Sequence, residues 1–124
     1  MSDPIRIHSL LERIEEAIAL INENTSHIKS ADDFLQSSDG MFALSGVCMQ
    51  LVFIGESVKV ISAKAEANYL HQYKNIPWTS IMGLRDIIAH EYHHIDAEEI
   101  FKVIKKDLPI LLTTIEQMKK DLHQ

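Results

Sequence analysis

The sequence predicts an all-α protein, an antiparallel bundle of four to five helices built from a single domain over residues 1–124. Three observations predict this fold. Apolar residues recur at steps of three and four along most of the chain, as on one face of a helix. Only four glycines and three prolines are present, so few turns interrupt long elements. A composition of 46% apolar and 24% charged residues is that of a globular chain with a core.

The first predicted helix begins at Pro4, which suits a helix start after Asp3, and fades over residues 22–26. Its apolar stripe consists of Ile7, Leu10, Leu11, Ile14, Ala17, Ile18 and Ile21. Residues 31–38 then form either a short second helix or an irregular connector. Asp39 and Gly40 are expected to form a turn before the next helix.

The central predicted helix covers residues 41–71 and is apolar around much of its circumference. Its main stripe is Leu44, Val47, Leu51, Ile54, Val58, Ile61 and Ala65, with Phe42, Val52, Phe53 and Val60 beside it. Such a helix lies at the centre of a bundle or also packs on another subunit. Gly46 and Gly55 are expected where another backbone approaches closely. Residues 40–55 carry no charge, but a membrane span needs about 20 apolar residues, so we expect a buried helix in a soluble protein.

Two further helices complete the predicted bundle. A short one opens after Pro77, and its apolar face is expected to consist of Ile81, Leu84, Ile87 and Ile88. The last begins near Asp96 or Ala97, and Pro109 should kink or divide it. The apolar stripe of this last helix is Ile100, Ile104, Leu108, Leu111, Ile115, Met118 and Leu122.

Charge and cysteine content narrow the function classes. A formal charge of −6 argues against broad non-specific binding to nucleic acid, which requires many contacts to phosphate, but it leaves room for a local positive site. The single cysteine, Cys48, has no partner for an internal disulfide and is expected to be buried. No signal peptide is recognisable, and a reducing cytoplasm is the expected location.

Chemistry-bearing residues gather in RDIIAHEYHHID, residues 85–96. Arg85 offers a charged planar fork for phosphate, and His90 can take and give protons near neutral pH. Tyr92 adds a hydroxyl that can accept a modification. In an ideal helix Arg85 and His90 lie about 140° apart and about 7.5 Å apart along the axis. Both can therefore reach one phosphate only where the helix bends or ends near His90, or where long side chains converge in a groove.

Plainer interpretations of these residues remain open. An arginine and a histidine five residues apart occur by chance in many helices. His90 and His94 have the spacing of two metal ligands on one helix face, although no cysteine pair or second histidine cluster accompanies them. We therefore expect neither a metal nor a cofactor. Glu56, inside the apolar central helix, is expected to be a buried partner of Arg85 or Tyr92, with a solvent-facing carboxylate as the alternative. Trp78 is expected to be a core or interface anchor.

The sequence resembles the HepT-like family of the HEPN superfamily, all-helical proteins of bacteria and archaea. The resemblance is carried by QLVFIGESVKVI (residues 50–61), IPWTSIMGLRDIIAHEYHHID (residues 76–96) and Leu108-Pro109. It implies that Arg85 and His90 are ribonuclease residues. It also implies that a minimal nucleotidyltransferase antitoxin transfers AMP to Tyr92, and that a homodimer brings two motifs to one cleft. Asp86 stands where the family typically has Asn, and its charge is expected to lower affinity for phosphate.

Three hypotheses follow, from different classes. The first is a metal-independent endoribonuclease toxin that cleaves RNA with Arg85 and His90 and is silenced by AMP transfer to Tyr92. The second is a non-catalytic dimeric binding partner, or a subunit that presents a substrate to a nucleotidyltransferase. The acidic net charge and Asp86 motivate it. The third is a structural helical module without a site.

Overall fold

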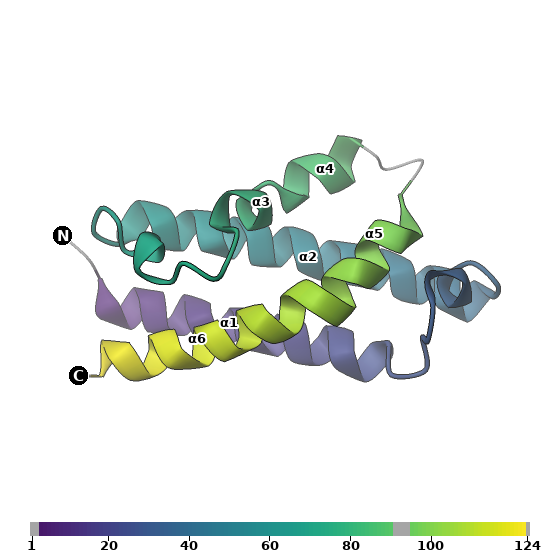
Figure 1. Ribbon diagram of the computed structural model, residues 1–124, viewed down its shortest axis with the longest axis horizontal. Coiled ribbons are helices and arrows are strands. Elements are labelled where there is room, and N and C mark those ends of the chain that lie inside the picture. The colour runs from purple at the N-terminus through teal and green to yellow at the C-terminus, as the bar shows by residue number, and fades with distance from the viewer. Residues whose placement is uncertain (1–2, 91–94, 124) are drawn as a thin grey trace.

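The computed structural model describes residues 3–90 and 95–123, apart from the side chain of His90, and every regular element in those ranges is helical. Figure 1 shows an elongated bundle in which the long helices α1 and α2 lie antiparallel and α6 runs along α1. The all-α prediction is therefore confirmed. The elements are α1 (Pro4–Asn24), η1 (Ala31–Phe34), α2 (Ser38–Lys64), η2 (Leu70–Gln72), α3 (Trp78–Met82), α4 (Leu84–His90), α5 (Ala97–Lys102), the π turn η3 (Val103–Asp107) and α6 (Leu108–Leu122).

Helix α1 forms as its sequence predicts. Asp3 caps it by accepting a hydrogen bond from the backbone N–H of Arg6 at 3.1 Å, and Pro4 opens the first turn. All seven residues of the predicted stripe are buried. At the other end, the Thr25 hydroxyl donates to the carbonyl of Ile21 at 2.7 Å and helps to terminate the helix.

Helix α2 differs from the prediction at both ends. Asp39 and Gly40 lie inside its first turn rather than in a separate turn, because the Ser37 hydroxyl accepts the Gly40 N–H at 2.9 Å and starts the helix there. A Cβ at Gly40 would collide with the backbone carbonyl of Asp33, so this glycine permits close packing. The helix ends at Lys64, seven residues before the predicted end, and Asn68 follows with a left-handed φ of 70° that helices do not adopt.

The other two glycines of α2, Gly46 and Gly55, have different environments. A Cβ at Gly55 would lie 2.8 Å from the backbone carbonyl oxygen of Ile81, so α3 approaches α2 as closely as the sequence predicts. A Cβ at Gly46 would meet nothing within 4 Å, so no described part of the same chain approaches closely there. Gly46 lies on the outer side of α2 and has room for a side chain.

The inner face of α2 is the centre of the core. Leu51, Ile54 and Val58 have no exposed surface, and Cys48 is buried as predicted. Burial raises the pKa of the Cys48 thiol to about 11. By length and composition alone α2 is apolar enough to cross a membrane, but the central helix of a bundle meets the same criterion, so this is weak evidence for a span.

The segment after Pro77 forms two short helices, α3 and α4, where the sequence predicted one. They are separated at Gly83. Ile81 is buried, and Leu84 and Ile88 are partly buried against the core, but Ile87 is 59% exposed. The prediction that Ile87 belongs to the apolar face is wrong, because the division at Gly83 interrupts the face that begins at Ile81.

The last predicted helix is divided as Pro109 requires. A π turn, η3, separates α5 from α6, and Pro109 lies in the first turn of α6, where its missing N–H is not needed. Asp96 caps α5 by accepting from the N–H groups of Glu98 and Glu99. The predicted stripe through these helices is buried from Ile100 to Met118, and Leu122 packs partly against the core.

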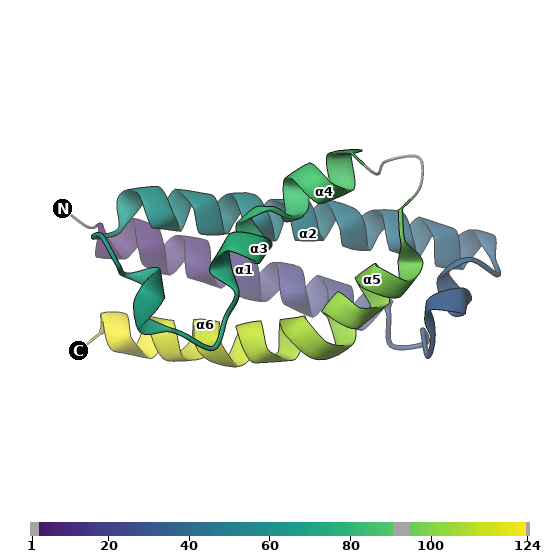
Figure 2. The same ribbon diagram turned by 45° about the horizontal axis from the view of Figure 1, so that its top comes forward.

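The connector between α2 and α3 is fastened to α6, as Figure 2 shows from a second direction. The Tyr73 hydroxyl donates to a carboxylate oxygen of Asp121 at 2.6 Å, and the Asn75 amide donates to the Thr114 hydroxyl at 3.0 Å. Trp78 is buried, as predicted for an anchor, and its Nε1–H donates to the carbonyl of Tyr73 at 3.0 Å. These bonds fix the start of α3 and hence the position of α4.

Candidate active site

Helix α4 carries the first residue of the predicted site onto the outside of the bundle. Figures 1 and 2 both show α4 lying along α2. Leu84 and Ile88 hold α4 to the core, and the side chain of Arg85 between them is 57% exposed. The guanidinium of Arg85 is therefore accessible to solvent.

Arg85 is paired with Glu56 of α2. Its Nε lies 3.2 Å from Oε1 of Glu56, and the Glu56 side chain is 42% exposed. The contact has ion-pair distance but not hydrogen-bond alignment, and Oε1 itself is shielded from solvent. Pairs this exposed contribute about 0–1 kcal/mol to stability, so the contact orients the arginine more than it holds the fold together.

The partner predicted for Glu56 is thus present, although the environment differs from the prediction. The apolar sequence around Glu56 predicts a buried carboxylate. The residue instead faces the outer side of α2, under Arg85, where both side chains reach water. Asp86, the next residue along α4, is exposed in the first turn of that helix.

The rest of the predicted site lies outside the described residues. His90 is the last described residue of α4, but its side chain is not described, and Tyr92, His93 and His94 fall in the gap at residues 91–94. The convergence of Arg85 and His90 on one phosphate therefore stays a prediction, as does the role of Tyr92. The alternative metal site at His90 and His94 is untested for the same reason. Elsewhere in the described chain, no group of three potential metal ligands is found.

An apolar stripe on the outer side of α2 was suggested by the sequence and is exposed in the structure. Phe42 is 82% exposed, Met49 66% and Phe53 37%. With Gly46 they follow steps of four, three and four, which is the spacing of a seam between two packed helices. We call Phe42, Gly46, Met49 and Phe53 the outer stripe. Glu56 follows it along the same helix.

A feature that sequence reasoning missed is a pair of adjoining hollows between α1 and α2. Their volumes are about 380 Å³ and 390 Å³, and Leu20 and Gln50 line both. Neither is lined by Arg85 or Glu56 among the described side chains. No motif marks these hollows, because they arise from the fit of two helices, and Gly46 lines only the first of them.

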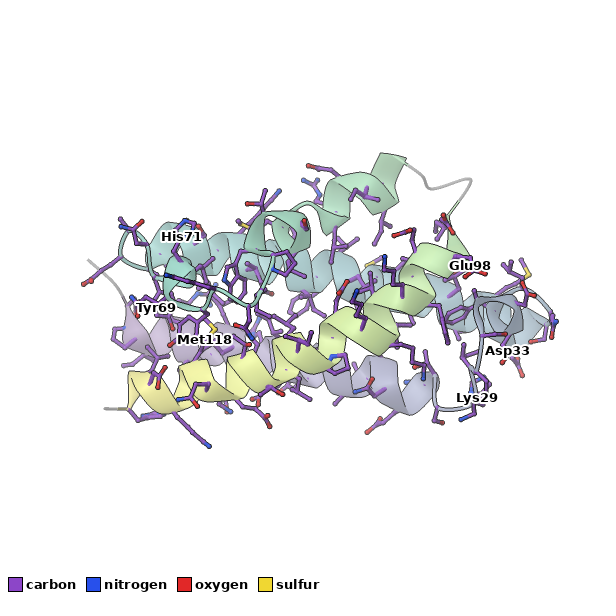
Figure 3. All side chains as sticks on the ribbon, in the orientation of Figure 1. Lys29, Asp33, Tyr69, His71, Glu98 and Met118 are labelled. Carbon is purple, nitrogen blue, oxygen red and sulfur yellow. The ribbon has the colours of Figure 1, made fainter. Side chains whose placement is uncertain are left out.

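A polar cluster of Tyr69, Tyr73, Gln117 and Asp121 joins the connector before α3 to the end of α6. Figure 3 shows Tyr69 and Met118 toward one end of the bundle and Lys29 and Asp33 toward the other. The rings of Tyr69 and Tyr73 meet edge to face with centroids 6.0 Å apart. The hydrogen bond from Tyr73 is the main cause that lowers the pKa of Asp121, followed by the bond from Gln117. This cluster fastens the connector to α6.

Comparison with known proteins identifies the family. A family model described as "Ribonuclease HepT-like" matches residues 14–118. The chain belongs to the HepT-like ribonuclease family. A probable ribonuclease HepT of Thermococcus cleftensis is 34% identical over 110 residues, which cover 89% of this chain and 93% of that protein. The matched range contains Glu56 and all of α4, so it includes the described part of the predicted site.

Two relatives from Methanocaldococcus jannaschii extend the comparison. A protein described as a gamma-glutamylcyclotransferase and putative RNase is 32% identical over 92% of this chain, which spans about half (48%) of its length. A putative RNase is 28% identical over 94% of this chain and 87% of its own length. No solved structure matches the chain. Family membership supports a nuclease at the family level, and the sequence-based resemblance to HepT-like proteins is confirmed.

Proposed function

We propose that this member of the HepT-like family is a metal-independent endoribonuclease that acts through Arg85 and His90. The proposal is supported by the exposed position of Arg85 on α4, in a chain that belongs to a family of ribonucleases. This arginine is half-exposed on α4, oriented by Glu56, and lies five residues before a histidine of the same helix. An arginine and a histidine supply the charge stabilisation and the proton transfer that cleavage of a phosphodiester needs.

The proposed reaction uses the substrate's own 2′-hydroxyl as the nucleophile. The 2′-oxygen attacks phosphorus while His90 takes its proton, and the bond from phosphorus to the 5′-oxygen breaks. The protonated His90 returns this proton to the leaving 5′-oxygen, so the products are a 2′,3′-cyclic phosphate and a 5′-hydroxyl. Arg85 stabilises the negative charge that builds on the phosphoryl oxygens.

The protein is proposed to act as a homodimer. The outer stripe exposes two phenylalanines and a methionine on one helix, and a second copy that covers it would bury this apolar surface. Two copies also bring two Arg85 side chains to one assembly, which offsets locally a chain charge of −6. An RNA strand would meet more positive charge there than on one chain.

Control of the activity is proposed to come from a minimal nucleotidyltransferase antitoxin in the cytoplasm, which would transfer AMP to Tyr92. The support is the resemblance together with the position of Tyr92, two residues after His90. An added AMP is bulky and negatively charged, so it would block an RNA strand by both size and repulsion. The protein would then be the toxin of a toxin–antitoxin pair.

The test is cleavage of single-stranded RNA by purified protein in the presence of EDTA. Wild type should cut and leave 2′,3′-cyclic phosphate ends. Arg85→Ala and His90→Ala should each lose at least about a hundredfold in kcat, the scale of a removed charge stabiliser or general base. Arg6→Ala, which removes a similar exposed arginine from α1, is the matched control and should cut normally. Unchanged cutting by either site variant would refute the assigned roles.

A second candidate is the non-catalytic binding partner of a nucleotidyltransferase. The ion pair favours it, because Glu56 neutralises much of the charge of Arg85 and Asp86 is exposed on the same helix. It predicts a tight complex with the transferase and no growth arrest when this chain is expressed alone. Growth arrest that disappears in His90→Ala would exclude it.

A further inference from the structure

We infer that Glu56 is a positioning residue that fixes which edge of the Arg85 guanidinium meets the phosphate. The inference rests on the proposed function and names a residue that acts through the arginine. Glu56 is on α2, 29 positions before Arg85, and the fold brings Oε1 to within 3.2 Å of Nε. The contact is between side chains of two different helices, so it is a product of the tertiary structure.

The position at which Glu56 contacts the guanidinium determines which edge of that group faces a ligand. A guanidinium has five N–H donors, one on Nε and two on each terminal nitrogen. The carboxylate contacts Nε rather than the fork formed by the two terminal nitrogens, Nη1 and Nη2. That fork matches two oxygens of a phosphate. Since the side chain of Arg85 is 57% exposed, it can keep this pairing and still take a ligand.

Glu56 is also held more firmly than the arginine it contacts. Its neighbours Ile54, Gly55 and Ser57 are buried, so the backbone at Glu56 belongs to the core of α2. The missing Cβ at Gly55 lets the carbonyl of Ile81 approach, and this closeness sets how far α3 and α4 stand from Glu56. A short side chain on a fixed helix thus restrains a long, flexible one on a neighbouring helix.

The position of Glu56 orients Arg85 toward a phosphate, but its negative charge repels that phosphate. A carboxylate beside the arginine reduces attraction to phosphate, so affinity alone would favour its absence. Orientation of the guanidinium requires only a side-chain oxygen in contact with Nε. Glu56→Gln keeps a side-chain oxygen of similar reach and removes the charge, whereas Glu56→Ala removes both. The pair of variants therefore separates orientation from electrostatics.

The experiment measures kcat and KM for RNA cleavage by wild type, Glu56→Gln and Glu56→Ala. Glu56→Ala should lower kcat about tenfold to a hundredfold, which is the scale for a misplaced catalytic group. Glu56→Gln should keep kcat within about threefold and lower KM about fivefold, because one repelling charge is lost near the phosphate. Glu23→Ala removes an exposed carboxylate from α1 and should leave both constants unchanged. Thermal melts of all four proteins check that the fold is intact.

Two outcomes overturn the inference. If Glu56→Ala keeps the wild-type kcat, the arginine needs no support. If Glu56→Gln is as slow as Glu56→Ala, the charge itself is required and the role is not positioning. Absence of cleavage by wild type would instead refute the proposed function. The contact between Glu56 and Arg85 would then be tested by a second measurement that does not depend on cleavage.

This second measurement follows the NMR signal of the Arg85 Nε–H group, assigned by its absence in Arg85→Lys. A guanidinium in contact with a carboxylate at Nε should give a signal in wild type that is shifted from the position of a free arginine. We expect the signal to persist in Glu56→Gln and to return to the position of a free arginine in Glu56→Ala. An identical signal in wild type and Glu56→Ala would overturn the inference whether or not RNA is cleaved.

Discussion

The close contact between α2 and α3 predicts that Gly55→Ala and Gly46→Ala have opposite effects on stability. Both substitutions replace a glycine inside the same helix, so both gain about 1 kcal/mol of helix propensity. At Gly46 the new Cβ meets nothing within 4 Å, and the gain remains. At Gly55 the new Cβ would lie 2.8 Å from the carbonyl oxygen of Ile81, so α3 must move by about half an ångström to restore an ordinary contact.

Overpacking of this kind costs about 1–3 kcal/mol. The propensity gain is common to both variants, so the difference between their free energies of unfolding isolates the steric cost. Gly46→Ala should therefore be more stable than Gly55→Ala by about 1–3 kcal/mol. For a chain of this length that difference corresponds to roughly 4–12 °C in Tm.

Urea and thermal unfolding, followed by circular dichroism, measure this difference directly. Gly46 lies in the outer stripe, so melts at several protein concentrations are needed to separate chain stability from self-association. Gly55→Ala should also slow RNA cleavage, because α3 leads into α4 and moves Arg85 relative to Glu56. Equal stability of the two variants would refute the close approach of α3 to α2.

Three further predictions concern the core, the connector and the outer stripe. Ile54→Ala should lower the free energy of unfolding by about 2–5 kcal/mol, because the side chain is fully buried, whereas Ile5→Ala at an 84% exposed position should change it little in the same urea titration. Tyr73→Phe should make the stability of the fold depend less on pH in the acidic range. The pKa of Asp121 is lowered in the folded protein, so the carboxylate stabilises the fold above its ordinary pKa of 3.8, and this contribution is lost as the pH falls through the lowered value. Melts between pH 2 and pH 6 should therefore fall less steeply in Tyr73→Phe than in wild type, and parallel curves would contradict this. Phe42→Asp should shift the protein from dimer to monomer in sedimentation velocity, with Ile5→Asp as the exposed control, and a dimer that survives the substitution would exclude the outer stripe as its interface.

The parts of the fold that were predictable are those decided within one helix. The stripes of α1 and α6 repeat every three or four residues, and Asp3 and Pro109 mark boundaries by chemistry that acts over a single turn. The end of α2 was harder to predict. Its apolar pattern continues to Ala65, yet the backbone is already extended at that residue, and no turn residue marks the position.

The errors occur where packing between helices decides the outcome. Gly40 was predicted to form a turn, yet the structure uses its small size to pack a helix start against η1. Ile87 continues an apolar pattern but is exposed, because the chain divides at Gly83 and α4 leaves the core. A sequence pattern records which residues are apolar and does not record how neighbouring helices fit together.

The candidate site was predictable in composition but not in geometry. A charged Glu56 inside an apolar helix indicated a partner, and the contact with Arg85 bears this out. That the contact involves Nε, and that both side chains are half-exposed, depends on the depth at which α4 lies on α2. The adjoining hollows between α1 and α2 left no signal in the sequence.

The central claim is that Arg85 and His90 act on one phosphodiester by using the neighbouring 2′-hydroxyl. The most direct measurement uses an oligodeoxynucleotide that contains a single ribonucleotide, incubated with the protein in EDTA. The account predicts one cut, immediately 3′ of the ribonucleotide, with a 2′,3′-cyclic phosphate at the new end and no cut by Arg85→Ala or His90→Ala. Cleavage of the all-deoxy strand, or a cut at the ribonucleotide that persists in either variant, would contradict it.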